Sequence, residues 1–188
     1  SILFIGSIIL FVILSELFFI FILPTSEIPE LHFSNNIIKY KPNQIGVIRV
    51  QDEIEAQYHI NSDGWNSGIK KYNIFKNKEI SRIAIIGDSF IEAFQVPFNN
   101  SMAEQLDNNL INSEVYRFAI SGAPLSQYLH ILRHEVLKYS PDLVVINLVH
   151  NDFEQSYLKH IGIYTSSFLK LKIADGKVVG EYNPVKYE

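Results

Sequence analysis

The sequence contains no cysteine, which excludes disulfide bonds and thiolate-ligated metal sites. It also has no block of like charges, and its formal net charge is −4. A nucleic-acid-binding domain needs a dense basic stripe, so we expect no nucleic-acid partner. His130 and His134 have the spacing of a metal-binding pair on a helix, but no acidic partner accompanies them. We therefore place both on the surface and predict neither a metal site nor a cofactor.

Several common motifs are missing as well. No Gly-x-Gly-x-x-Gly follows a strand-like run and no Gly-Lys-Ser/Thr loop occurs, which argues against the usual nucleotide-binding folds. The Gly-x-Ser-x-Gly elbow of ordinary α/β-hydrolases is absent. A haloacid-dehalogenase-like site would need a second Asp two residues after Asp88, where Phe90 stands.

Lys and Arg are absent before Lys39, and residues 2–23 are almost entirely Ile, Leu, Phe and Val. A helix of this length spans roughly 33 Å, close to the hydrocarbon thickness of a bilayer. We therefore predict one transmembrane helix, in segment 1–23, that contacts the membrane through residues 2–23. A cleaved signal peptide fits less well, because no small-x-small cleavage site precedes Pro24. The charge pattern leaves the orientation open.

Residues 24–80 are rich in Asn, Gly and Pro and form a predicted β-rich lead-in segment. Strand-like runs occur at 45–50 and 54–60. Asn61-Ser62-Asp63-Gly64 follows them, a turn signal in which the Gly accommodates positive φ.

Apolar strand-like runs alternate with helical patterns from residue 81 onward. The strand-like runs are 82–87, 115–120 and 143–149, and the helical patterns are 101–110 and 125–139. The first helix opens on a predicted capping box, Ser101 to Glu104. This order predicts a parallel sheet, and ligands of such sheets gather at the carboxyl ends of the strands. Asp175-Gly176 predicts a hairpin within 168–182.

Three polar blocks follow the three predicted strands: Gly87-Asp88-Ser89-Phe90, Ser121-Gly122-Ala123-Pro124 and His150-Asn151-Asp152. Each has an ordinary interpretation on its own, as a helix N-cap, a turn glycine and a polar strand end. Together they resemble, in order and spacing, the first three sequence blocks of the SGNH (GDSL-like) hydrolase superfamily. His150 stands where the family often has Gly. The resemblance covers about residues 61–188.

The resemblance implies that Ser89 is a catalytic nucleophile. The implied oxyanion hole combines the Ser89 and Gly122 backbone N–H groups with the Asn151 side chain, and Asp88 and Asp152 are supporting residues. The implied fold for 81–188 is a three-layer α/β/α flavodoxin-like arrangement. The expected function is hydrolysis or transfer of acyl esters, with acetyl or acyl esters of envelope polysaccharide or lipid as substrates.

In the family, the general base is a His three residues after an Asp. None of the six His residues of this sequence has an Asp at that spacing. We expect that the hydrolase domain is incomplete at its C-terminal end and that the missing block follows Glu188. The alternative is a non-catalytic homologue that binds glycan or acyl groups. We expect a single-pass membrane protein with a periplasmic or extracellular catalytic domain. Anchored relatives often act on envelope polysaccharides, so O-acetyl groups on glycans are the leading expected substrate.

Overall fold

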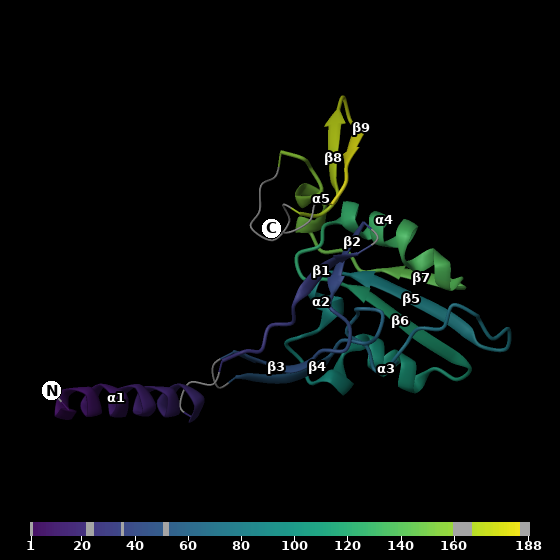
Figure 1. Ribbon diagram of the computed structural model, residues 1–188. Helices are drawn as coiled ribbons and strands as arrows, with labels where there is room; N and C mark the ends of the chain where they lie inside the picture. Colours follow the sequence, from purple (N-terminus) through teal and green to yellow (C-terminus); the bar gives the residue numbers. More distant parts are fainter. Residues whose placement is uncertain (1, 22–24, 35, 51–52, 160–166, 185–188) are drawn as a thin grey trace.

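The computed structural model describes residues 2–21, 25–34, 36–50, 53–159 and 167–184. They form an N-terminal helix and a globular part built on a parallel sheet (Figure 1). The mixed α/β architecture predicted from the alternating pattern is confirmed.

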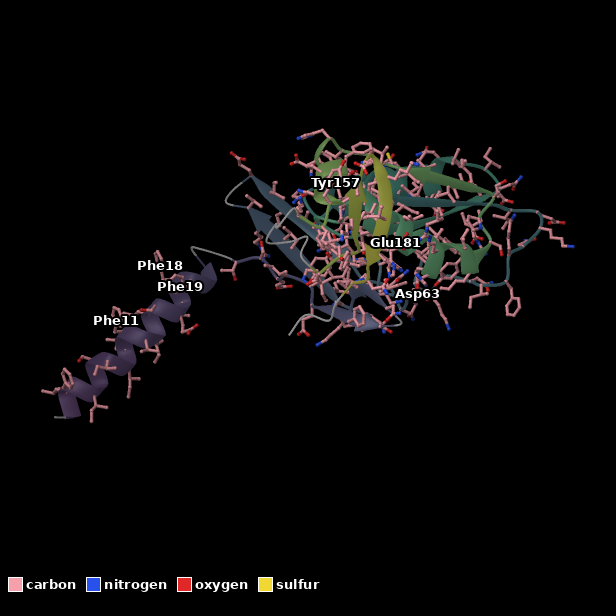
Figure 2. All side chains as sticks on the ribbon, turned by 90° about the horizontal axis from the view of Figure 1, so that it is seen from above. Phe11, Phe18, Phe19, Asp63, Tyr157 and Glu181 are labelled. Carbon is pink, nitrogen blue, oxygen red and sulfur yellow. The ribbon has the colours of Figure 1, made fainter. Side chains whose placement is uncertain are left out.

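The N-terminal apolar run forms α1 (Ile2–Phe21), which lies apart from the globular part in Figure 1. Its large apolar side chains from Leu3 to Phe19 are exposed, and Figure 2 shows Phe11, Phe18 and Phe19 along it, away from the rest of the molecule. Within the described ranges, none of the helices combines the length and the apolar character that a membrane crossing requires. The predicted transmembrane helix over residues 2–23 is therefore unsupported.

The lead-in segment consists of two antiparallel hairpins. The predicted strands near 45–50 and 54–60 are confirmed as β3 (Ile45–Val50) and β4 (Ile54–His59). A second hairpin, β1 (Leu31–Ser34) with β2 (Ile37–Tyr40), was not predicted. The predicted turn at Asn61 is present, because its Oδ1 accepts the N–H groups of Asp63 and Trp65 at 2.9 and 3.1 Å.

The main sheet has three parallel strands in the order β6-β5-β7. Its central strand β5 (Ser81–Gly87) pairs with β6 (Ser113–Ala119) on one side and β7 (Leu143–Ile146) on the other. All three match predicted strands, although β7 ends three residues earlier than predicted. The parallel sheet is therefore confirmed.

The two faces of this sheet are covered by different elements. Ala84 and Ile86 of β5 pack with α4 (Leu125–His134) and the lead-in segment, whereas Ile83 and Ile85 pack with α2 (Ser89–Glu92) and α3 (Met102–Asn109). Figure 1 shows α4 and α3 on opposite sides of the strands. Successive side chains of a strand point to opposite faces, which explains why β5 is apolar throughout. The remaining elements are η1 (Phe98–Asn100), η2 (Val136–Tyr139), α5 (Asn151–Gln155), β8 (Lys170–Ala174) and β9 (Lys177–Tyr182).

The hairpin predicted around Asp175-Gly176 is confirmed as β8–β9. Both turn residues have positive φ, 49° and 70°, as a two-residue hairpin of this type requires.

The predicted capping box, Ser101 to Glu104, is wrong, because the two side chains do not make the capping hydrogen bonds. Ser101 is the N-cap of α3, but its hydroxyl makes no capping hydrogen bond and is buried without a partner. Glu104 instead accepts the backbone N–H of Gly68 at 3.0 Å and pairs with Arg117 at 3.2 Å. A buried guanidinium needs a charged partner, and here it takes the carboxylate that a capping box would use.

Candidate active site

The first strand end carries Ser89 at a strand-to-helix turn. Gly87 ends β5 and Ser89 begins α2, with Asp88 between them as the N-cap. The buried Asp88 carboxylate accepts the Phe90 N–H at 3.0 Å. The capping group is thus Asp88 and not Ser89, which leaves the serine hydroxyl free for chemistry.

Gly87 is needed at this turn because of a close side-chain contact. A Cβ added there would lie 2.9 Å from the Cβ of Ile91 and 3.4 Å from that of Asn147. The missing side chain lets α2 fold directly back over the strand end. The tight turn brings Ser89 to the edge of the sheet.

The second strand end places Gly122 beside this turn. Gly87 and Ala119 are paired in register, so the Asp88–Ser89 and Ser121–Gly122 segments leave neighbouring strands at the same edge. Gly122 has φ +73°, a conformation that favours glycine. The N–H of Ala123 donates to the carbonyl of Ile120 at 3.1 Å and closes the turn.

A buried carboxylate, Glu92, lies between the first two strand ends. Its Oε1 accepts the backbone N–H of Ser121 at 2.8 Å and the hydroxyl of Tyr40, while its Oε2 accepts the Ser121 hydroxyl. Burial raises the pKa of the fully buried Glu92 from 4.5 to about 7, and the hydrogen bonds from Ser121 and Tyr40 act in the opposite direction. The sequence analysis did not identify this residue. The available signal was a charged residue within the otherwise apolar run 90–94.

The third strand end is organised by Asp152. This buried carboxylate accepts the N–H of Val149 at 2.7 Å and the hydroxyl of Tyr128, from α4, at 3.1 Å. Burial raises the pKa of Asp152. These contacts fix the start of α5, where Asn151 lies.

Asn151 is half-buried, and its amide donates to the side chain of Gln155 at 3.0 Å. An amide nitrogen has two donors, so one hydrogen remains for another acceptor. No hydrogen bond joins Asn151 to Ser89, and its role in an oxyanion hole stays a prediction.

Residues 83–173, from β5 to β8, match the family model for GDSL-like lipase/acylhydrolase. This match supports the assignment of the region to the SGNH (GDSL-like) hydrolase superfamily. No curated protein and no solved structure matches it. The matched range contains all three strand ends, and the parallel sheet fits a GDSL-like fold. The match supports a hydrolase or esterase type of function.

A GDSL-like acylhydrolase that uses a serine needs a base to accept the hydroxyl proton. Among the described histidines, none forms a hydrogen bond to Ser89. They are His32, His59, His130, His134 and His150, while His160 lies outside the described residues. The structure therefore assigns no base from the part of the chain that it describes.

The predicted surface position of His130 is wrong. His130 is 3% exposed, and its Nε2 lies 2.7 Å from the carbonyl oxygen of Asn36. This contact links α4 to the β1–β2 hairpin, a pairing that helical spacing alone does not reveal. Burial lowers the pKa of the imidazole. The described residues contain no cluster of three His, Asp or Glu side chains suited to a metal ion.

Proposed function

We propose that this GDSL-like protein hydrolyses or transfers acyl esters through an acyl-enzyme intermediate on Ser89. The observation that carries the proposal is the placement of Ser89, within the matched family range, at a turn beside the Gly122 loop. Asp88 and Asp152 support this site by holding α2 and the start of α5 in place.

In the first step, the Ser89 oxygen attacks the ester carbonyl carbon and its proton passes to a base. The carbonyl oxygen becomes an oxyanion that accepts hydrogen bonds from the Ser89 and Gly122 N–H groups and from the Asn151 amide. The carbon–oxygen bond then breaks, and the alcohol leaves with the proton. Water or a sugar hydroxyl attacks the acyl-serine in the second step. Losing one oxyanion donor typically lowers the rate by about 10²–10³.

The proposal includes two finer points. The globular part is a three-layer α/β/α, flavodoxin-like domain, supported by the different elements that cover the two sheet faces. The substrates are acetyl or acyl esters of envelope polysaccharide or lipid, which follows from the family resemblance. Comparing the rates on an O-acetylated polysaccharide and on long-chain acyl esters separates these two substrate classes.

We also propose that α1 attaches the protein to a membrane, with the catalytic domain on the periplasmic or extracellular side. Support comes from the exposed large apolar side chains of this helix, such as Leu3 at 90% and Phe11 at 72% exposure. Apolar surface of this extent marks an interaction site. The protein should stay with membranes in an alkaline carbonate wash, whereas a variant lacking residues 1–23 should be released. Release of the intact protein would refute the attachment.

A fluorophosphonate probe tests the serine. The full-length protein should be labelled on Ser89, and Ser89→Ala should abolish the labelling. Ser81→Ala is the matched control, since Ser81 is at the opposite end of β5 and its loss should leave labelling unchanged. A folded protein without labelling would favour the alternative, a non-catalytic homologue that binds glycan or acyl groups.

A further inference from the structure

The proposed reaction gives Glu92 no role, yet this carboxylate contacts the loop that precedes Gly122. Glu92 is fully buried and three residues after Ser89. It accepts three hydrogen bonds, two of them from Ser121 and one from Tyr40. Burying a carboxylate is costly unless donors compensate it, so the arrangement calls for an explanation.

We propose that Glu92 is a positioning residue that fixes the Ser121–Gly122 turn and so places the Gly122 N–H in the oxyanion hole. The inference rests on the proposed function, since it concerns the same site. Glu92 holds Ser121 by both its backbone N–H and its hydroxyl. Because two bonds to one residue restrict its rotation, the next peptide plane, which carries the Gly122 N–H, is restricted as well.

The backbone of Glu92 is also held by hydrogen bonds, so the residue can hold the Ser121–Gly122 turn in place. Its carbonyl accepts the Asn66 amide at 2.8 Å and the buried Arg117 guanidinium at 3.4 Å. The positive charge of Arg117 also lowers the pKa of Glu92, opposing the effect of burial. Donors therefore surround both the carboxylate and the carbonyl, and hold both groups in place.

Tyr40 and Asn66 both come from the lead-in segment, 52 and 26 residues away from Glu92 along the chain. The lead-in segment therefore supplies part of the support for the proposed oxyanion hole.

The test combines steady-state kinetics with phosphorus NMR of the fluorophosphonate adduct on Ser89, using the full-length protein. In Glu92→Leu, which removes all three hydrogen bonds, we expect kcat to fall about ten- to a hundredfold with KM within twofold, less than the loss of a whole oxyanion donor. The phosphorus resonance of the adduct should move toward that of the denatured adduct. A kcat and a resonance like those of the wild type would overturn the inference.

Glu135→Leu is the matched control. Glu135 is also buried and bonds Lys39 of the lead-in segment at 3.4 Å, but it lies at the far end of α4 from Gly122. Its replacement should leave the resonance and KM unchanged. If the control moved the resonance as far as Glu92→Leu, a general effect on folding would replace the inference.

If Glu92→Leu does not fold, Ser121→Ala decides. This variant keeps the backbone bond to Glu92 and loses only the hydroxyl bond, so we expect a few-fold lower kcat and a smaller shift of the resonance. Wild-type values would overturn the inference. Absence of any adduct in the wild-type protein would overturn the proposed function, and the inference with it, and is thus a distinct result.

Discussion

Glu92 should make the folded state less stable as the pH rises from about 4.5 to 7. Burial raises its pKa to about 7 in the folded protein, against an ordinary value of 4.5. Between these values the folded state binds more protons than the unfolded state, so the free energy of unfolding falls with rising pH. The stabilisation from this group is thus complete below pH 4.5 and lost above about 7.

The pKa values set the size of the effect. The difference of about 2.5 (7 minus 4.5) corresponds to about 3 kcal/mol, at about 1.4 kcal/mol per pH unit. Such a loss is a substantial part of the stability of an ordinary domain. Because other groups also titrate in this range, the informative quantity is the difference between the wild type and Glu92→Gln.

Urea unfolding at several pH values between 4.5 and 8 measures this difference. The wild type should lose about 3 kcal/mol relative to Glu92→Gln across the range, because glutamine does not titrate. Tyr40→Phe should extend the decline above pH 7, since it removes a hydrogen bond that lowers the pKa of Glu92. Parallel curves for the wild type and Glu92→Gln would refute the reasoning.

Two further substitutions test local packing. Gly87→Ala places a Cβ 2.9 Å from that of Ile91, so urea unfolding should show a loss of about 1–3 kcal/mol. Its control, Gly180→Ala, meets nothing closer than 3.7 Å and should change little. Ser101→Ala should be neutral or slightly stabilising in thermal melts, because the hydroxyl is buried without a partner. A loss near 1 kcal/mol, typical of a removed cap, would contradict this reading.

Local signals in the sequence predicted most of the central fold. The buried strand β5 and the β8–β9 hairpin match their predicted ranges within a few residues, because apolar runs and an Asp-Gly turn depend on neighbouring residues alone. The order of elements then predicted a parallel sheet. That sheet placed Ser89 and Gly122 at one edge, which the register of β5 and β6 confirms.

The errors involve partners that are distant in the sequence. Glu104 has the spacing of a capping residue, but it binds Arg117 and the Gly68 N–H. His130 has the spacing of an exposed helical residue, but it packs under the β1–β2 hairpin and bonds Asn36. Neither set of contacts follows from periodicity, because the partners belong to other elements of the fold: Arg117 to β6, and Gly68 and Asn36 to the lead-in segment.

The lead-in segment contributes directly to the interior of the hydrolase fold. Trp65 packs edge-to-face on Phe118 of β6 at 5.4 Å, and the Asp63 carboxylate accepts the Tyr139 hydroxyl at 3.1 Å. These contacts bury the same sheet face as α4. Removing the segment would expose that face to water. The lead-in segment therefore stabilises the fold through these contacts, which do not involve Glu92.

The burial of Glu92 explains why this residue lowers the stability of the fold and still has a role in the proposed site. Its ionised form destabilises the fold above pH 7, yet this form accepts all three hydrogen bonds from Ser121 and Tyr40. A glutamine would remove the cost, but its amide NH₂ would donate where Oε2 now accepts, so the Ser121 hydroxyl would have to become the acceptor. Stability alone therefore favours an uncharged residue, whereas a fixed Ser121–Gly122 turn favours the carboxylate. Retaining glutamate at this position is expected if the turn must be held rigidly for catalysis.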